Sequence, residues 1–260
     1  MQTPIIVMGA AGRMGATIVR LVHEDKELTL VGRVEIASRL TELTPLAGCI
    51  DDSDLDTLLS RVGKAVIIDF TAPAYSVAIA KIVAKHGASQ VIGTTGFSEQ
   101  ELMELKLCAG KIPIFWSPNM SVGVNVLLKI LPELVRLLGE SYDMEMMEIH
   151  HNKKKDSPSG TALRLAEAMV KARDWDLKNV ACYHREGIVG ERPQKEVGLQ
   201  TLRGGDVVGV HTAYFFGPGE RIEVTHQAHS RENFAQGAIR AAKWLADQKA
   251  STLFSMEDML

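Results

Sequence analysis

The stretch Ile5–Gly15, which reads IIVMGAAGRMG, decides the fold of the first part of this chain. An apolar, β-branched run leads directly into glycines at positions 9, 12 and 15, and apolar side chains then recur at helical spacing as far as Val22. A strand that enters a helix through a glycine-rich turn is typical of a dinucleotide-binding βαβ unit. The sequence therefore predicts a Rossmann-like domain at this end of the chain.

The glycine turn is the first predicted ligand site. Gly9 would let the chain turn off the strand, Gly12 would let backbone N–H groups approach a pyrophosphate, and Gly15 would let helix and strand pack closely. The spacing is G-x-x-G-x-x-G instead of G-x-G-x-x-G, so a tight turn without a ligand is the alternative interpretation. The predicted cofactor contacts of the turn are Gly9, Ala10, Ala11, Gly12, Arg13 and Met14.

Glu35 ends the next β-rich run, 20 residues beyond Gly15, where a ribose-binding acid is expected. Its carboxylate would accept hydrogen bonds from the adenine-ribose hydroxyls and repel a 2′-phosphate, which predicts a preference for NADH. Ile36 adds no cation, but Arg13 and Arg39 are near enough in sequence to assist a 2′-phosphate. Some use of NADPH is therefore expected as well.

Short β-branched runs alternate with helical segments through the first 116 residues, which predicts a parallel sheet. Two of the predicted strands end in Asp69–Thr71 and in Gly93–Gly96, at the edge where α/β sheets bind ligands. Gly93, Thr94 and Thr95 are therefore candidate cofactor contacts, although ordinary turn chemistry would explain the same residues. The predicted strands are Ile5–Met8, Leu30–Glu35, Ala65–Phe70, Gln90–Thr94 and Ile112–Trp116, with a further helix over Pro73–His86.

A different pattern begins after Ser121 and predicts an α+β domain with an open mixed sheet. Residues 122–230 form this domain in the prediction, whereas 1–121 and 231–260 form the Rossmann-like one, giving an α/β fold overall. The segment His184–Lys195 is predicted to be a loop. The predicted strands are Tyr142–His151, Val197–Arg203, Asp206–Phe216 and Arg221–Gln227, and the predicted helices are Leu127–Leu138, Thr161–Arg173 and Phe234–Gln248, the last packing back on the first domain.

Composition narrows the function classes. The 29 Lys and Arg residues against 32 Asp and Glu residues give a net charge of −3, which argues against a nucleic-acid or anionic-membrane partner. The three cysteines contain no C-x-x-C pair, so no metal site is predicted and a reducing compartment fits best. Neither a signal peptide nor an apolar run of about 18 residues is present, so we expect a cytoplasmic protein.

The segment His150–Thr161, HHNKKKDSPSGT, concentrates positive charge between a predicted strand and a predicted helix. The first N–H groups of that helix can hold a carboxylate, a nearby lysine can neutralise it, and a histidine can move a proton at neutral pH. This predicts a site for a small carboxylic acid, with His150 as the acid–base group. Separately, a charge run is usually a solvated loop and a lone strand histidine is usually structural.

These residues resemble the dihydrodipicolinate reductase family, also described as 4-hydroxy-tetrahydrodipicolinate reductase. The resemblance spans nearly the whole chain: GAAGRMG at 9–15, DFT at 69–71, VIGTTGF at 91–97, SPNMSVGVN at 117–125, EIHHNKKKDSPSGTAL at 148–163, REGIVGERP at 185–193 and GDVVGVHTAYFFGPGERIEVTH at 205–226. It implies NAD(P)H-dependent reduction of a cyclic imine dicarboxylate, derived from 4-hydroxy-tetrahydrodipicolinate, to tetrahydrodipicolinate in lysine and diaminopimelate biosynthesis.

The same resemblance implies roles for individual residues. His150 resembles the family's proton donor and acceptor, and Lys154 its second catalytic group. Two departures bear on the cofactor, since Ile36 stands where many members have Arg, and Met120 where some have an aromatic residue. The family also implies a homotetramer with sheets pairing across subunits. Substrate-binding residues would be His151, Gly160 and Thr161, and cofactor contacts would include Gly9–Met14, Glu35, Gly93–Thr95, Ser117, Pro118, Asn119 and Met120.

Two other functions share part of this pattern. An aspartate or homoserine type of dehydrogenase would carry a similar glycine turn, but it would not need the segment His150–Thr161. A regulator that senses NADH without turnover would also bind the cofactor, but it usually adds a basic DNA-binding module, which this sequence lacks.

Overall fold

The computed structural model describes residues 2–260 and divides the chain into two compact units. One unit comprises the residues up to Val122 together with Glu232–Leu260, and the other comprises Gly123–Arg231. Each unit is built around its own sheet. No helix within residues 2–260 has the length and apolar character needed to cross a bilayer.

The first unit contains a seven-stranded sheet in the order β12-β6-β5-β4-β1-β2-β3, with every neighbouring pair parallel. The order reverses between β1 and β4, as in Rossmann folds, so the predicted parallel sheet is confirmed. β3 and β12 were not predicted, because two or three residues carry too little periodicity. The strands are β1 (Thr3–Met8), β2 (Leu28–Val34), β3 (Ile50–Asp52), β4 (Val66–Asp69), β5 (Ser89–Ile92), β6 (Ile114–Trp116) and β12 (Leu253–Phe254).

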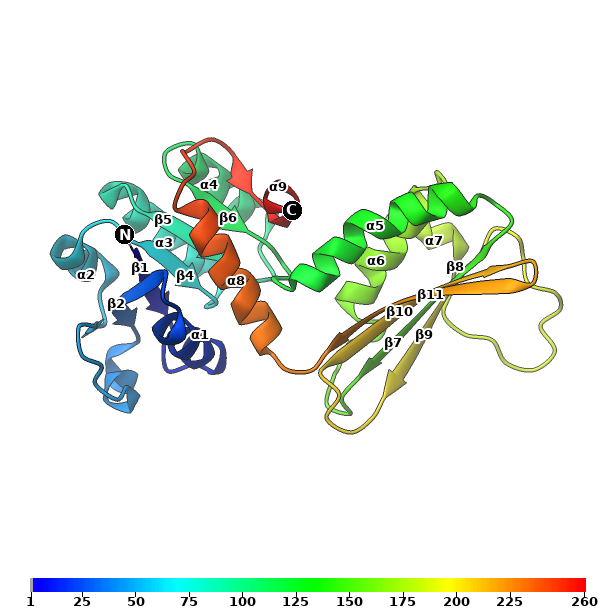
Figure 1. The fold of residues 1–260 in the computed structure, drawn as a ribbon, viewed down its shortest axis with the longest axis horizontal. Coiled ribbons are helices and arrows are strands. Elements are labelled where there is room, and N and C mark those ends of the chain that lie inside the picture. Colours follow the sequence, from blue (N-terminus) through cyan, green and yellow to red (C-terminus); the bar gives the residue numbers. More distant parts are fainter. Residues whose placement is uncertain (1) are drawn as a thin grey trace. The chain divides into compact units, whose positions relative to one another are not determined.

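Helices cover both faces of this sheet (Figure 1), and local sequence signals fix several of their ends. Asp54 caps α2 by accepting from the Thr57 N–H at 2.9 Å, and Ser98 forms a capping box with Glu101 at the start of α4. Pro73 occupies the first turn of α3. The helices are α1 (Arg13–Glu24), η1 (Ala37–Glu42), α2 (Leu55–Val62), α3 (Pro73–His86), α4 (Glu99–Ala109), α8 (Glu232–Leu245) and α9 (Met256–Met259).

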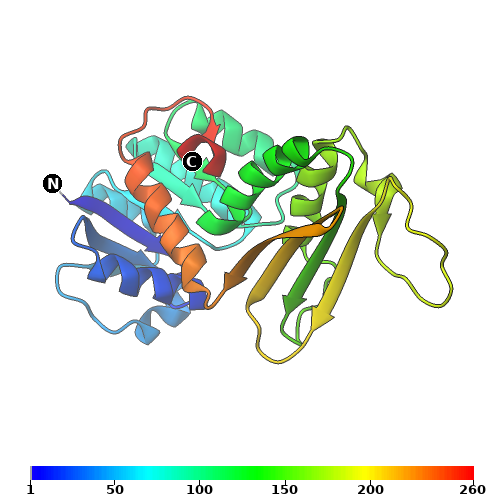
Figure 2. The ribbon, with the colours of Figure 1, turned by 45° about the vertical axis from the view of Figure 1, so that its right-hand side comes forward.

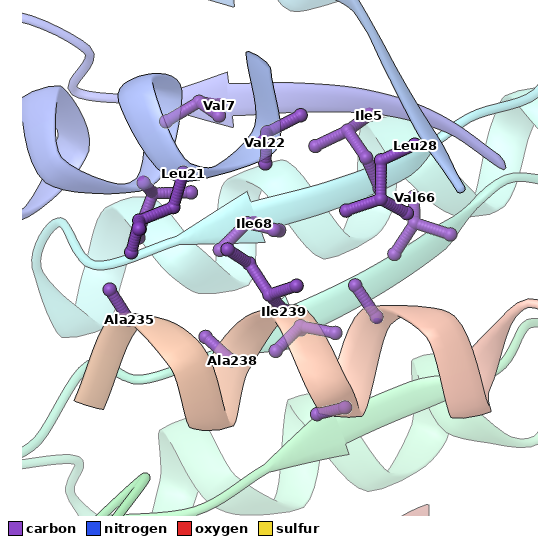
Figure 3. Close-up of a cluster of buried hydrophobic side chains, with 14 of the residues drawn as sticks. Ile5, Val7, Leu21, Val22, Leu28, Val66, Ile68, Ala235, Ala238 and Ile239 are labelled. Carbon is purple, nitrogen blue, oxygen red and sulfur yellow. The ribbon is translucent and has the colours of Figure 1, made fainter. Parts of the chain in front are cut away.

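The C-terminal helix α8 packs on the first unit. Figure 3 shows Ala235, Ala238 and Ile239 on the side of α8 that faces Leu21 of α1 and Ile68 of β4. These side chains share one apolar core, whereas α2, α3 and α4 cover the other face of the sheet with a second core. Burial of small alanines allows this helix to approach the sheet closely.

The second unit contains a five-stranded mixed sheet in the order β11-β10-β7-β9-β8. β9 is parallel to both β7 and β8, whereas β10 is antiparallel to β7 and β11, so the predicted open mixed sheet is confirmed. Its strands are β7 (Asp143–His150), β8 (Ala181–Cys182), β9 (Val197–Arg203), β10 (Gly209–Gly217) and β11 (Glu220–Ala228).

The helices of the second unit lie on one face of this sheet (Figures 1 and 2). The opposite face leaves large apolar side chains partly exposed, among them Leu202 at 46% and Phe216 at 38%. The helix predicted from Leu127 begins five residues earlier and tolerates Pro132 in its interior. The helices are α5 (Val122–Leu138), α6 (Gly160–Lys171) and α7 (Leu177–Val180).

Residues 183–196 contain neither helix nor strand, which confirms the predicted loop over His184–Lys195. Two arginines hold the loop against β7. Arg185 donates to Glu145 at 2.8 Å, and Arg192 donates to Asp143 at 2.8 Å and to the Met144 carbonyl at 3.0 Å. These charge-assisted hydrogen bonds fix the base of the loop.

Candidate functional site

The glycine turn after β1 is shaped by its three glycines. Gly9 has φ +62°, a left-handed conformation that glycine adopts without steric cost. A Cβ at Gly15 would overlap the Gly9 carbonyl oxygen, and one at Gly12 would lie 3.1 Å from the same atom. Gly12 stands before α1 without a side-chain cap, so the first N–H groups of this helix remain available to an anion.

Glu35 lies beside this turn, directly after β2. Its side chain is buried, and its Oε2 accepts from the Ala11 N–H at 2.9 Å while Oε1 accepts from the Ile36 N–H at 3.0 Å. Arg39 donates to the Ala11 carbonyl at 3.0 Å, and its Nη1 lies 4.0 Å from Glu35 Oε2. An acid and a cation therefore stand together at the predicted ribose position.

The predicted cofactor contacts in the loop after β5 differ in how exposed they are. Thr94 is buried, and its hydroxyl accepts from Ser76 at 3.0 Å, so this hydroxyl serves the interior of the protein. Thr95 is exposed. A Cβ at Gly93 would overlap the Phe70 ring. The glycine at this position therefore lets Phe70 pack closely, whereas the sequence had indicated that a ligand would approach here.

Asp69 ends β4 and is fully buried. Its Oδ1 accepts from the N–H and hydroxyl of Thr71 at 2.9 and 2.6 Å, and its Oδ2 accepts from Gln90 at 3.0 Å. Burial raises the pKa of this carboxyl group. Asp69 therefore shapes the turn that brings Thr71 against Gly9, where a Cβ would lie 3.4 Å from Thr71 Cγ2.

The segment Ser117–Met120 follows β6. Ser117 is buried and donates to the Asn119 carbonyl at 2.7 Å, and Asn119 Oδ1 accepts from the Ser121 N–H at 2.9 Å. Pro118 is exposed, and Met120 is buried in the core. A Cβ at position 237 of α8 would overlap the Met120 carbonyl oxygen, so the return of α8 sets the position of this segment.

In the second unit, His150 ends β7 and is 8% exposed. The strand alternates so that Met144, Met146, Glu148 and His150 are its buried residues. His150 Nδ1 lies 2.5 Å from Glu148 Oε2. An inward-facing carboxylate and imidazole thus form a pair at the end of an otherwise apolar row.

Glu148 is surrounded by hydrogen-bond donors. Arg203 donates to both of its oxygens at 2.8 Å, and the Ser159 N–H donates at 2.9 Å. Burial alone would raise the pKa of Glu148, but the hydrogen bonds from Arg203, His150 and Ser159 outweigh it and lower that pKa to about 2. Glu148 is therefore ionised at neutral pH.

Burial also lowers the pKa of His150, while the neighbouring Glu148 opposes that shift. Lys154 and Arg203 add to the lowering through their positive charge. The histidine therefore lies within the electrostatic reach of both cations. This environment favours a neutral imidazole that takes up a proton only with the help of Glu148.

The segment that follows β7 places the other predicted substrate residues. Successive side chains point to opposite faces only within a strand, and β7 ends at His150, so His151 does not have to point away from the face of His150. The Nδ1 atom of His151 accepts a hydrogen bond from the Lys153 N–H at 3.2 Å. Lys154 Nζ lies 3.0 Å from Asp156 Oδ1. This ion pair and the hydrogen bonds to the carboxylate lower the pKa of Asp156.

The start of α6 lies close to this segment. Ser159 caps the helix by accepting from the Ala162 N–H at 3.1 Å. Gly160 is exposed, and no described atom would lie within 4 Å of a Cβ placed there. Thr161 is half-buried in the first turn. The first residue of the helix therefore has open space on its Cβ side.

Sequence reasoning missed Glu148, Arg203 and His211. Glu148 carried a detectable signal, since it lies two residues before His150 on the apolar face of a strand. Arg203 and His211 come from other strands and pair in register with His150 and Glu148 respectively. His211 is buried, its ring lies 5.1 Å from that of His150, and burial lowers its pKa to about 3.

Among the described residues, the remaining features of the site are its lack of a metal-binding cluster and a cavity next to Arg203. Within residues 2–260, no group of three or more His, Cys, Asp or Glu side chains could hold a metal ion. A cavity of about 700 Å³ adjoins Arg203 on the second unit. It is lined by Ser157, Pro158, Tyr183, His184, Leu199, Gln200, Thr201 and Arg203.

Comparison with known proteins gives consistent results over the whole chain. Residues 3–120 match the family model described as "Dihydrodipicolinate reductase, N-terminus", and residues 123–260 match "Dihydrodipicolinate reductase, C-terminus". The chain is similar to the 4-hydroxy-tetrahydrodipicolinate reductase of Nitratidesulfovibrio vulgaris strain DP4, with 65% identity over 259 residues and 100% of both chains covered. It is 64% identical over 260 residues to the enzyme of that name from Oleidesulfovibrio alaskensis, again with 100% of both covered.

Among solved structures, the fold is similar to that of the dipicolinate-bound dihydrodipicolinate reductase from Paenisporosarcina sp. TG-14. The TM-score is 0.81, the sequence identity is 21%, and the match covers 100% of both chains. This fold is therefore found in a solved structure.

Proposed function

The chain belongs to the dihydrodipicolinate reductase family, and from this premise we propose that it reduces 4-hydroxy-tetrahydrodipicolinate to tetrahydrodipicolinate with a nicotinamide dinucleotide. The enzyme is an oxidoreductase and serves a reduction step in lysine and diaminopimelate biosynthesis. The observation that carries the proposal is the buried Glu148–His150 pair, which opens a segment containing Lys154 and the α6 start.

The substrate side of the reaction follows from the charges of this segment. The two carboxylates of the substrate need cations and N–H donors, and Lys154 and the α6 start at Gly160 and Thr161 supply them. His151 adds a further polar contact. Loss of the 4-hydroxyl group as water gives the conjugated imine. Addition of hydride to this imine leaves negative charge on the substrate, so a proton from His150 and the positive charge of Lys154 stabilise the transition state.

The first unit fits a dinucleotide. Side chains at Gly9, Gly12 and Gly15 would fill the turn, and the start of α1 lacks a side-chain cap, so a pyrophosphate has both room and donors there. When bound, the cofactor supplies the hydride. Glu35 would bind its adenine ribose, and the strand-end loops at Gly93–Thr95 and Ser117–Met120 would lie at its nicotinamide end.

We assign NADH as the preferred cofactor because the Glu35 carboxylate would repel a 2′-phosphate. Arg39, 4.0 Å from Glu35, provides enough positive charge for some NADPH use. We further propose a homotetramer in the cytoplasm. The exposed Leu202 and Phe216 on the uncovered sheet face favour subunit contacts, and three unpaired cysteines suit a reducing compartment. Nucleic acid and membrane are not expected partners.

A coupled assay tests this function. Adding the product of dihydrodipicolinate synthase to enzyme and NADH should oxidise the NADH, so its absorbance should decrease. A regulator that senses NADH would bind the cofactor without consuming it. An aspartate or homoserine type of dehydrogenase would turn over its own amino-acid substrate and leave this imine untouched, and either result would overturn the proposal.

A further inference from the structure

We propose that Glu148 and Gly209 together select the nitrogen of His150 that exchanges the proton, with Glu148 binding Nδ1 and Gly209 keeping Nε2 accessible. The proposal rests on the proposed function, in which His150 is the proton donor. Glu148 is then a positioning residue, since it acts through His150 without touching the substrate. Gly209 has the complementary task of leaving space.

The contact with Glu148 decides which ring nitrogen of His150 carries the proton. His150 Nδ1 and Glu148 Oε2 are 2.5 Å apart. An ionised carboxylate can only accept hydrogen bonds, and Glu148 is ionised because Arg203 and Ser159 donate to it. Nδ1 must therefore carry a hydrogen. Neutral His150 is held as the Nδ1–H tautomer, which leaves the lone pair on Nε2.

Glu148 is held firmly in place by its hydrogen-bond donors. It is 1% exposed, and its donors come from three elements: Arg203 and Thr201 on β9, Ser159 before α6, and His150 on β7 itself. Each oxygen accepts at least two of these bonds. A carboxylate fixed in this way also fixes the orientation of the imidazole that it binds.

Gly209 leaves space beside the Nε2 atom of His150. Gly209 begins β10, beside the end of β7, and a Cβ at this position would lie 3.0 Å from His150 Nε2 and 3.4 Å from its Cδ2. The φ of Gly209 is not positive, so its backbone does not require glycine. The lack of a side chain therefore matters for the neighbouring ring, since a methyl group would crowd the nitrogen that faces away from Glu148.

The ring has a third neighbour that limits its rotation. His211 packs edge-to-face against His150 with ring centroids 5.1 Å apart and an interplanar angle of 74°. His211 is itself buried, and its Nε2 lies 3.1 Å from Ser159 Oγ. The groups that face His150 are thus Glu148 on β7, Arg203 on β9, His211 on β10 and Lys154 in the following segment.

Imidazole NMR with ¹⁵N-histidine tests the tautomer directly, with the His150 signal assigned by its loss in His150→Gln. The wild-type protein should show His150 protonated on Nδ1 at a pH where the ring is neutral. In Glu148→Gln, Ser159 and Thr201 attract the amide oxygen to the Oε1 position, whereas Arg203 donates to both positions, so the NH2 group faces His150. Because NH2 only donates, His150 should switch to the Nε2–H tautomer.

The kinetics of Glu148→Gln separate positioning from a purely structural role. Loss of the anionic partner lowers the pKa of His150, so the alkaline limb of kcat/KM should move down by about one pH unit. We expect kcat to fall on the order of 10²-fold. The KM for NADH should stay unchanged, because the proposed NADH contacts lie in the first unit and Glu148 lies in the second. A lower melting temperature with an unaltered pH profile and tautomer would overturn the proposal.

Gly209→Ala provides the second test and remains informative if Glu148→Gln loses its fold. This variant should keep the Nδ1–H tautomer but lose about tenfold or more in kcat, because the methyl group displaces or covers Nε2. Gly204→Ala is the matched control, since no described atom would lie within 4 Å of its Cβ and its φ is not positive. Equal turnover in both glycine variants would reject the role of Gly209.

A failure of this proposal can be distinguished from a failure of the proposed function. Wild-type His150 protonated on Nε2 would overturn the proposal even if the imine is reduced normally. Full turnover in His150→Gln would instead reject His150 as proton donor. The NMR signature does not depend on turnover, so the two results are independent.

Discussion

Lys154 Nζ lies 3.0 Å from Asp156 Oδ1, so the cation assigned to a substrate carboxylate is already paired with a carboxylate of its own segment. Asp156 also receives a hydrogen bond from the backbone N–H of Gly160, at the start of α6. The two donors proposed for the substrate thus meet on one internal acid. A substrate carboxylate that binds at this position competes with Asp156.

Asp156→Asn should therefore strengthen substrate binding. Removing the internal anion frees Lys154, and we expect the substrate KM to fall about two- to fivefold, as is usual for partly exposed charges. Steady-state kinetics with varied substrate measures this constant. Asp206→Asn removes the same charge from an exposed turn and serves as control. A higher KM in Asp156→Asn would show that Asp156 organises the segment instead.

Glu35 should govern the choice between the two cofactors. In Glu35→Gln, the loss of charge-assisted hydrogen bonds to the ribose should raise the KM for NADH about tenfold, while the KM for NADPH is spared because repulsion of the 2′-phosphate disappears. The ratio of kcat/KM for the two cofactors measures this effect. An unchanged KM for NADH would contradict the assignment of Glu35.

His150→Gln should remove the proton donor while leaving the fold intact. We expect kcat to fall by about 10²-fold or more, with NADH binding retained, because general acid catalysis contributes factors of this size. Stopped-flow turnover and fluorescence titration with NADH measure the two quantities. His23→Gln, an exposed histidine in the last turn of α1, is the matched control and should keep full activity. Retained turnover would exclude His150 from proton transfer.

His211 should make the protein sensitive to acid. Its pKa is lowered to about 3 by burial, with His150, His226 and Lys154 adding to the shift and Glu148 opposing it. Above pH 6.5 the histidine is neutral in both states, and below it the unfolded chain binds the proton first. The free energy of unfolding should therefore fall by up to about 1.4 kcal/mol per pH unit between pH 6.5 and 3.

His211→Gln removes this titration. Urea unfolding at pH 7, 6 and 5 should then show a shallower loss of stability with acid than in the wild-type protein, whatever the absolute stability at pH 7. The exposed His23→Gln serves again as the control and should keep the wild-type slope. Equal slopes in both variants would mean that His211 takes up a proton in the folded state.

Gly15→Ala should destabilise the first unit, because its Cβ would overlap backbone atoms of Gly9 and Ala10. Overpacking against backbone costs on the order of 1–3 kcal/mol, and NADH affinity should fall with it because the turn must move. Urea unfolding and NADH titration measure both effects. Gly110→Ala is the control, since its φ is −64° and its nearest neighbour would be 3.6 Å away. Equal stability of the two variants would contradict this account of the turn.

Much of the fold could be read from local patterns. The β1 run, the turn from Gly9 to Gly15 and the position of Glu35 are all set by residues close in sequence, and the structure places Glu35 against the turn at Ala11. Alternation along β7 indicated a half-buried strand. β3 and β12 escaped notice because strands of two or three residues show no period.

The candidate site was only partly predictable. His150 and Lys154 stand in a segment whose charge and position are unusual, so they could be picked out without a structure. Glu148 was overlooked because an isolated glutamate on a strand has no obvious task until its partners are known. Thr94 was expected to face a ligand, but its hydroxyl is bound to Ser76, a residue 18 positions away that no spacing rule connects to it.

The sequence by itself determined the longer strands, the glycine turn and the chemical types gathered after β7, because periodicity and turn chemistry act over a few residues. The partners of Glu148 were decided only by the tertiary structure. The sheet places β7 between β9 and β10, so that Arg203 and His211 flank the end of the strand. A buried carboxylate stays ionised only if donors such as Arg203 surround it, and strand register, which here joins residues more than 50 positions apart, supplies that arginine.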